Sequence, residues 1–302
     1  MYEKIKRNIK HPEKIIIKIG KVSRLISDKV YLKAYYYNIF GKKLNLQEPR
    51  TFNEKLQWLK LYDRQPKYTA MVDKYMAKKY VADIIGEEYI IPTYGIWKKF
   101  DDIDFEILPK QFVIKCTHDS AGLVIVEDKK NFNVEAAKKK INYCLNRNFY
   151  YSGREWPYKN CKPRIIIEKY MSCDDKDLPD YKIHCFNGEP RLILVCRNRF
   201  KKTGMTEDFF SEKWEHLSVV RSNHPNSPKE IEKPVLLEEM LELAKKLSAN
   251  IPFLRVDFYT VAGKIYFGEL TFFPASGLEK YEPEEWDETF GDWLILPGLE
   301  KK

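Results

Sequence analysis

Apolar positions recur at two different spacings along the chain, and these spacings separate a helical first part from a strand-rich remainder. Thr51-Phe52-Asn53-Glu54 has the spacing of a capping box, and the apolar residues that follow it recur at helical spacing. A second helix is predicted over residues 69–85, ending at Gly86. From Phe112 onward, short apolar runs alternate with turn residues, which is typical of antiparallel strands. We therefore expect an α+β protein.

Paired apolar runs in the second part of the chain predict hairpins. The clearest turn is Asn187-Gly188, because these two residue types tolerate the positive φ angles of a two-residue hairpin turn. The predicted pairs are 112–116 with 123–126, 181–186 with 191–196, and 253–259 with 264–270. A single strand is expected over 164–171, and helices are expected over 134–148 and 235–249.

The positive charge of the chain is concentrated at its beginning. The 302 residues carry a formal net charge of +9, and residues 1–50 hold 13 basic and 4 acidic residues, which accounts for all of it. Residues 1–45 mix lysines with aliphatic and aromatic residues, and Pro12 and Gly20 interrupt them, so several short helices are expected. Two interpretations remain open: a helical cap with its lysines in water, or a peripheral contact with an anionic membrane.

Composition argues against several classes of protein. The body is charge-balanced, so it lacks the basic character expected of a nucleic-acid binder. The sequence contains no run of about 20 apolar residues, so no transmembrane helix is predicted. Ile15-Ile16-Ile17-Lys18-Ile19 is too short for an export signal, and the six cysteines form no CxxC pair. We expect a cytoplasmic protein with reduced core thiols.

Charged residues stand at the ends of several predicted strands. Lys115 ends an apolar strand beside a small-residue loop that finishes at Gly122, where backbone N–H groups can approach phosphate oxygens. Glu168 ends another strand, and Lys182 follows Asp180 by two residues. Arg255-Val256-Asp257 and Gly268-Glu269-Leu270-Thr271 lie on the two strands of one hairpin. Paired across it, Asp257 and Glu269 would place two carboxylates on one face, as octahedral Mg²⁺ requires.

The order of these motifs resembles that of the ATP-grasp enzymes, most closely the TupA-like branch named for teichuronopeptide biosynthesis. The resemblance runs from about Phe52 to Gly298. Its most specific strings are Phe52-Asn53-Glu54-Lys55, Asp73-Lys74-Tyr75, Ile114-Lys115, Asp180-Tyr181-Lys182, Arg255-Val256-Asp257-Phe258 and Gly268-Glu269-Leu270-Thr271-Phe272. It implies an ATP-grasp fold with antiparallel sheets, divided into a basic helical segment (1–50), a helical subdomain (51–110), a lid (111–175) and a large subdomain with the metal site (176–302).

The resemblance also implies roles in binding ATP. Lys115 would contact the α- and β-phosphates, and the loop from His118 through Ser120 to Gly122 would cover them. Glu168 would bond the adenine amino group, flanked by Lys169 and Met171. Asp175 or Asp177 would lie near the ribose, and Lys182 would reach the γ-phosphate.

The resemblance implies a metal site as well. Asp257 and Glu269 would hold Mg²⁺, with Arg255 stabilising the transferring phosphoryl group. The family pattern has Asn two residues after the glutamate, and this chain has Thr271 there, which makes its hydroxyl a weaker candidate ligand.

The expected activity is an ATP- and Mg²⁺-dependent carboxylate–amine ligase that acts through an acyl phosphate. Its acceptor would be a sugar acid or amino acid of a capsule, O-antigen or teichuronopeptide-like polysaccharide, since many relatives serve such pathways. Arg197 and Arg199 would bind the acceptor carboxylate or lie at the surface, and His118 and His184 would be acid–base groups or structural. Two alternatives remain: a glycosyltransferase using Asp101-Asp102-Ile103-Asp104, and a non-catalytic scaffold.

Overall fold

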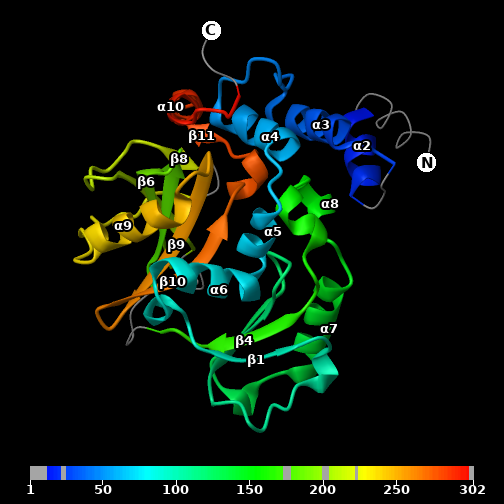
Figure 1. The fold of residues 1–302 in the computed structure, drawn as a ribbon, viewed down its shortest axis with the longest axis vertical. Helices are drawn as coiled ribbons and strands as arrows, with labels where there is room; N and C mark the ends of the chain where they lie inside the picture. The colour runs from blue at the N-terminus through cyan, green and yellow to red at the C-terminus, as the bar shows by residue number, and fades with distance from the viewer. Residues whose placement is uncertain (1–11, 22–24, 173–177, 199–203, 222–223, 299–302) are drawn as a thin grey trace.

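Two antiparallel sheets form the frame of the protein (Figure 1). The computed structural model describes residues 12–21, 25–172, 178–198, 204–221 and 224–298. The smaller sheet has the strand order β1 (Thr93–Trp97), β4 (Ile165–Lys169), β2 (Phe112–Cys116), β3 (Leu123–Val126). The larger sheet has the order β10 (Lys264–Thr271), β9 (Phe253–Val261), β5 (Asp180–Phe186), β6 (Glu189–Arg197), β7 (Thr206–Ser211). The predicted α+β class with antiparallel sheets is confirmed.

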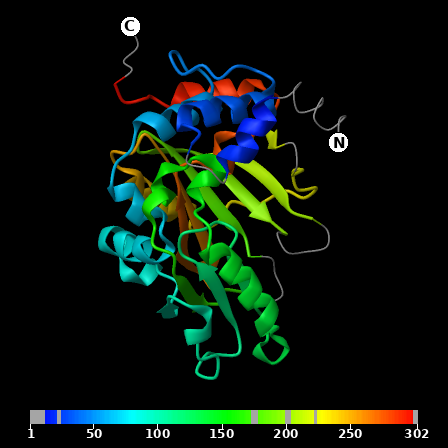
Figure 2. The same ribbon diagram turned by 90° about the vertical axis from the view of Figure 1, so that its right-hand side faces the viewer.

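Helices cover these sheets and join them. A short ladder of β8 (Val220–Arg221) and β11 (Tyr281–Glu282) adds a third sheet. The α-helices of the described residues are α2 (Pro12–Gly20), α3 (Asp28–Phe40), α4 (Phe52–Tyr62), α5 (Lys67–Val72), α6 (Lys74–Ile85), α7 (Val134–Leu145), α8 (Tyr150–Gly153), α9 (Leu237–Ser248) and α10 (Glu285–Trp293). In side view α7 lies beside the smaller sheet, whereas α2, α3 and α10 lie at the opposite end of the molecule (Figure 2).

The three predicted hairpins are confirmed, together with their turn chemistry. The β5–β6 turn has Asn187 at φ 52° and Gly188 at φ 86°, and the β9–β10 turn has Ala262 at φ 49° and Gly263 at φ 73°. Positive φ at both central residues is the geometry that matches the right-handed twist of the flanking strands. The capping box at α4 is also present, with the Thr51 side chain accepting from the Glu54 N–H and the Glu54 side chain reaching back.

The helix predicted over residues 69–85 is wrong in one respect. The chain forms two helices, α5 and α6, and Asp73 interrupts them in an extended conformation. The Asp73 carboxylate accepts hydrogen bonds from the N–H groups of Tyr75 and Met76, so it caps α6. Both helices bury apolar residues in the same core. The apolar spacing in the sequence therefore continues across Asp73 and does not reveal where α5 ends and α6 begins.

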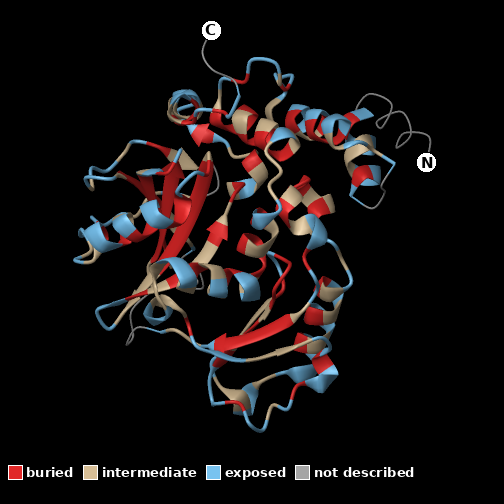
Figure 3. Cartoon of the chain, viewed as in Figure 1, coloured by how far each residue is buried: buried red, intermediate tan, exposed pale blue. Residues whose placement is uncertain are grey.

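The larger sheet has one apolar and one charged face. Side chains alternate along β5, so Ile183 and Cys185 lie on one face and Asp180, Lys182 and His184 on the other. Helix α9 packs on β5, β6 and β9, and the contact of Ser248 with Cys185 places it on the apolar face. Figure 3 shows how thoroughly the strands are buried. Asp180, Lys182 and His184 therefore lie on the face of the sheet opposite α9.

Arg154 is one of several residues that attach the N-terminal helices to the body. The Tyr31 hydroxyl also donates to the Ser152 carbonyl, and Arg64 pairs with Asp28. Arg154 is 1% exposed, and its guanidinium lies 4.3 Å from the centroid of the Tyr31 ring. It donates to the Gly20 carbonyl at 2.8 Å and pairs with Asp28 at 3.2 Å. The expected short helices are present among the described residues, with α2 ending at Gly20.

Candidate functional site

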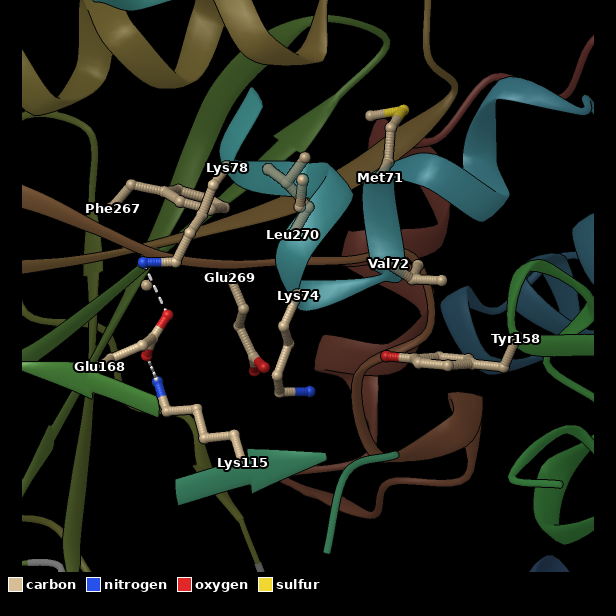
Figure 4. A pocket seen from close by; sticks show the side chains of 12 residues that line it. Met71, Val72, Lys74, Lys78, Lys115, Tyr158, Glu168, Phe267, Glu269 and Leu270 are labelled. Atoms are coloured by element: carbon tan, nitrogen blue, oxygen red, sulfur yellow. Dashed lines mark ion pairs between the residues drawn. The ribbon is translucent and has the colours of Figure 1, made fainter. Parts of the chain in front are cut away.

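A cavity lies between the two sheets, with helix α6 along one side (Figure 4). Its lining combines the charged ends of β2 and β4 with the edge strand β10. The polar residues that line it are Lys74, Lys78, Lys115, Tyr158, Glu168 and Glu269. The sequence predicts Lys115 and Glu168 for one side and Glu269 for the other, and the structure brings these three together.

Glu168 is the centre of the first group of charges. The residue is 4% exposed, and its two oxygens bind different lysines: Lys115 Nζ lies 2.5 Å from Oε2, and Lys78 Nζ lies 2.7 Å from Oε1. Glu168 pairs with Val113 on β2, so Lys115 lies on the same face two residues further along. Burial raises the pKa of Glu168, but the two lysines outweigh it and hold that pKa at about 2.

The second group of charges lies on the polar face of the larger sheet. Lys182 pairs in register with Asp257, which pairs with Glu269. Lys182 Nζ lies 2.5 Å from both Asp180 Oδ2 and Asp257 Oδ2. Arg255 donates to both oxygens of Asp257, at 2.6 and 2.7 Å, and to Glu269 Oε1 at 3.0 Å. These side chains form one continuous network.

Burial and charge act against each other in this network. Burial raises the pKa of Asp257, but Arg255 and Lys182 outweigh it, so the net shift is downward. Asp180 has its pKa raised, because burial and the charge of Asp257 exceed the effect of Lys182. Burial lowers the pKa of Lys182, but the two aspartates raise it further, so the net shift is upward. The two aspartates therefore favour the charged form of Lys182.

A bulge in β10 aims Glu269 at the cavity. The register shifts between Phe267 and Glu269, which leaves Gly268 as the extra residue. A Cβ at Gly268 would lie 3.1 Å from the Asp257 carbonyl oxygen and 3.0 Å from the Tyr259 ring. Glycine therefore permits the close approach of the two strands at the point where the carboxylates meet.

The donor set fits Mg²⁺. Asp257 and Glu269 are direct cross-strand partners, as predicted, and the Thr271 hydroxyl lies 3.4 Å from Glu269 Oε1. Mg²⁺ takes one or two carboxylates and completes its shell with substrate phosphates and water. Within the described ranges no group of three or more His, Cys, Asp or Glu side chains is arranged to hold a metal, so the remaining ligands would come from the substrate. The metal role of the three residues stays a prediction.

The predicted phosphate loop is anchored more firmly than expected. The His118 ring is 2% exposed and its Nε2 lies 3.1 Å from the Cys144 carbonyl oxygen, while burial lowers its pKa. Asp119 pairs with Arg147 and accepts from the Ala121 N–H. A Cβ at Gly122 would lie 2.6 Å from Cys116. Ser120 and Ala121 are the exposed members of this loop. The contacts of His118 and Gly122 are therefore packing contacts, and their part in phosphate binding stays a prediction.

The other predicted residues are placed as follows. Lys169 is exposed, and its N–H donates to the Pro92 carbonyl at 2.9 Å. Met171 is half-buried. His184 is buried with Nδ1 3.0 Å from the Lys182 carbonyl oxygen, and burial takes its pKa well below the usual value. Asp175, Asp177 and Arg199 lie outside the described residues, and Arg197 ends β6.

Three polar residues of the cavity have no role predicted from the sequence, although Lys74 lies in the string Asp73-Lys74-Tyr75. Lys74 and Lys78 lie four residues apart on α6, so they share one face of the helix. Tyr158 lies in a short 3₁₀ segment (Trp156–Asn160), and Figure 4 shows its hydroxyl pointing into the cavity. The lysine spacing is a usable signal, but a lysine pair on a helix is usually solvated, and nothing in the sequence marks Tyr158.

The described cysteines are buried thiols, and two aspartates of residues 101–104 make local polar contacts. Five cysteines of the described residues are free and buried: Cys116, Cys144, Cys161, Cys185 and Cys196. Cys173 lies outside the described residues. In the string at 101–104, Asp101 pairs with Lys138 at 2.5 Å, and Asp104 accepts from the Glu106 N–H. No helix in the described part of the chain is both long and apolar enough to cross a bilayer.

Comparison with known proteins assigns the chain to a class and then to a family. The family model described as TupA-like ATPgrasp matches residues 54–295 of the chain. The chain belongs to the TupA-like ATP-grasp family. No curated protein matches its sequence.

Several solved structures of ATP-grasp ligases are similar to the chain at low identity. D-alanine–D-alanine ligase from Bacillus anthracis, complexed with ATP, is 18% identical with a TM-score of 0.39, over 67% of this chain and 54% of that one. The Helicobacter pylori enzyme is 17% identical with a TM-score of 0.41, over 82% and 70%. The ATP-grasp ligase PsnB, complexed with a phosphomimetic variant of its minimal precursor, Mg and ADP, is 10% identical with a TM-score of 0.40, over 73% and 57%. The chain thus spans about half the length of the first of these structures.

Proposed function

We propose that the protein is an ATP- and Mg²⁺-dependent carboxylate–amine ligase. The observation that supports this most directly is a cavity lined by Glu168 with its two lysines on one side and by Glu269 on the other. Glu269 connects the cavity to the buried network of Arg255 and Asp257 behind it. Phosphoryl transfer needs positioning and charge neutralisation, and it requires no nucleophilic side chain. Membership in the TupA-like family supports the same reaction class.

In this proposal the chain's own residues act on the phosphates. Lys115 binds the α- and β-phosphates, and Lys182 turns from Asp180 and Asp257 toward the γ-phosphate. Arg255 stabilises the phosphoryl group as it passes to the acceptor carboxylate. Asp257 and Glu269, with Thr271 beside them, would hold Mg²⁺, which would neutralise phosphate charge.

The reaction has two balanced steps. The acceptor carboxylate attacks the γ-phosphorus, the bond to the β–γ bridging oxygen breaks, and ADP leaves with the electron pair of that bond. The amine then attacks the acyl carbon, expels inorganic phosphate and releases a proton. The buried network of Lys182 and Arg255 favours both steps because charge interactions are stronger away from water.

The acceptor class follows from the family resemblance. We propose a sugar acid or an amino acid of a surface polysaccharide precursor, such as a capsule, O-antigen or teichuronopeptide-like polymer, made in the cytoplasm. Hydroxylamine in place of the amine traps acyl phosphates as hydroxamates. Incubation with Mg-ATP and a panel of uronic and amino acids should give hydroxamate and ADP in equal amounts with one acceptor class. ADP release without hydroxamate from any carboxylate in the panel would overturn the proposed reaction.

The glycosyltransferase alternative lacks a supporting contact. A metal-bridged nucleotide sugar needs carboxylates that line a cavity. The cavity between the sheets is lined by Glu269 and by none of the exposed Asp101, Asp102 and Asp104. The scaffold alternative requires a degenerate ATP site. The charged residues Lys115, Glu168 and Glu269 that the resemblance implies are present around the cavity. Thr271 is the one departure from the family pattern.

A peripheral contact with an anionic membrane is the second part of the proposal, and helix α2 supports it. Gly20 and Glu13 are buried, while Lys14, Lys18, Ile15 and Ile19 are exposed, the two isoleucines by 40% and 43%. At about 100° per residue the two lysines form one stripe and the two isoleucines a neighbouring stripe. Lysines beside exposed aliphatic side chains match an anionic bilayer surface, because the charges meet headgroups while the isoleucines enter the interface.

A further inference from the structure

The Lys78–Glu168–Lys115 group holds one more cation than its carboxylate needs. Glu168 is 4% exposed, and each of its oxygens is bound by one lysine. Lys115 belongs to the strand that the proposed function assigns to the phosphates. Lys78 comes from α6, a different part of the chain, and neither the sequence motifs nor the family comparison gives it a role. We propose that Lys78 is a positioning residue that keeps Glu168 neutralised and so frees Lys115 to bind phosphate. This inference rests on the proposed function.

The two lysines differ in how firmly they are held. Lys78 Nζ also donates to the Ile91 carbonyl at 2.5 Å, so its ammonium is fixed between a carboxylate and a backbone oxygen. Its side chain is 12% exposed, whereas that of Lys115 is 21% exposed. Figure 4 shows the three side chains in line, with Lys115 reaching up from β2 and Lys78 coming from the opposite side. Lys115 is the lysine that is placed to move.

Charge balance explains why the second lysine matters. A buried carboxylate that loses its partner is strongly unfavourable, because water no longer solvates it. If Lys115 alone balanced Glu168, turning it toward a phosphate would strand that charge. With Lys78 in place, Glu168 stays paired while Lys115 moves. The nucleotide then gains a cation without leaving a buried charge unpaired.

Ligands with and without phosphates separate this role from a purely structural one. Lys78→Met should weaken the binding of Mg-ATP and Mg-ADP by about tenfold, the equivalent of one strong charge-assisted contact. Adenosine binding should stay within about twofold, because the Glu168 carboxylate that would accept from the adenine amino group is still present in this variant. Lys79 is the exposed neighbour on the same helix, and Lys79→Met is the matched control that should bind all three ligands normally. Lys78→Arg keeps the charge and should keep most of the Mg-ATP affinity. If Lys78→Met does not fold, Lys78→Gln is measured in its place.

A double mutant tests the mechanism itself. In Glu168→Gln there is no carboxylate to strand, so adding Lys78→Met should change Mg-ATP affinity by less than about twofold relative to Glu168→Gln alone. An undiminished loss in that background would mean that Lys78 contacts the phosphates directly, and an equal loss for adenosine would mean a structural role. Either result, or normal Mg-ATP binding by Lys78→Met, overturns the inference. Failure of the unmodified protein to bind Mg-ATP would instead overturn the proposed function. Isothermal titration of the full chain measures all of these affinities.

Discussion

Asp257 and Glu269 are direct partners across the β9–β10 hairpin, and the guanidinium of Arg255 binds both carboxylates. The arrangement places two carboxylates on the charged face of the larger sheet with a guanidinium between them. The β10 bulge at Gly268 sets the direction of Glu269. This pair of strands is therefore the part of the fold on which the metal assignment depends.

Gly268→Ala should weaken Mg-ATP binding. The added Cβ would press on the Asp257 carbonyl oxygen at 3.1 Å, so β10 must shift and Glu269 must move with it. We expect about tenfold weaker Mg²⁺-dependent ATP binding and a loss of about 1–3 kcal/mol in the free energy of unfolding. Titration calorimetry and urea unfolding measure the two effects. Unchanged affinity would show that the bulge does not position Glu269.

The Glu168 pair should make stability depend on acid pH. The two lysines hold the pKa of Glu168 at about 2 in the folded protein, below the ordinary pKa of 4.5 that the group has in the unfolded chain. Its stabilising effect is therefore complete above about pH 4.5 and is lost as the pH falls toward 2, by an amount on the order of 3 kcal/mol. Glu168→Gln should be less stable than the unmodified protein at pH 7, and the difference should shrink between pH 5 and pH 3. A difference that stays constant over this range, measured by urea unfolding, would contradict the pairing.

Arg154 should anchor the N-terminal helices. Arg154→Leu removes the guanidinium that stacks on Tyr31 and binds the Gly20 carbonyl and Asp28, so we expect a loss of about 3 kcal/mol in the free energy of unfolding. The exposed Arg191 provides the control, because Arg191→Leu should change stability by less than about 0.5 kcal/mol. Faster proteolysis between residues 12 and 30 should accompany the first substitution. Equal stability of the two variants would show that the N-terminal helices are not held by this contact.

Membrane binding should depend on both stripes of α2. The double variant Ile15→Ser/Ile19→Ser should lower partitioning onto phosphatidylglycerol vesicles by about tenfold, since it removes the aliphatic side chains that enter the interface. Ile295, which is 65% exposed near the other end of the chain, gives the matched control Ile295→Ser. Vesicle sedimentation at low and physiological salt measures the effect. Binding that falls with salt but ignores the isoleucines would indicate a general polyanion contact and would contradict a membrane-specific surface.

The sequence predicts the hairpins well because their turns carry their own chemistry. Asn187-Gly188 and Ala262-Gly263 adopt the positive φ angles of two-residue turns, so they set the register of the strand pairs next to each turn, up to the bulge that each hairpin contains. Turn chemistry alone would pair Asp257 with Gly268 and place Glu269 on the opposite face, so the pairing of the two carboxylates depends on the bulge at Gly268, which the turn does not predict. The break between α5 and α6 at Asp73 is not predicted, because a helix-capping residue leaves the spacing of the apolar residues around it unchanged.

The contacts made over long distances in the sequence cannot be predicted in the same way. Lys78 reaches Glu168 across 90 positions, and the partner of a helix lysine depends on how the helix packs rather than on its neighbours in sequence. Arg154 escapes prediction for the same reason, since its burial depends on the N-terminal helices closing over it. His118 shows the reverse case, because a polar residue in a loop is expected to be accessible and is in fact buried.

Mg²⁺-dependent ATP binding tests the central claim most directly. The double variant Asp257→Asn/Glu269→Gln should lose it, because both carboxylates proposed to hold the metal become neutral. Asp101→Asn/Asp104→Asn is the matched control, since it alters two exposed carboxylates of the alternative site and should bind Mg-ATP normally. Titration calorimetry with and without Mg²⁺ gives the affinities, and the account predicts that metal dependence disappears in the first variant alone. Undiminished Mg-ATP binding by Asp257→Asn/Glu269→Gln would contradict it.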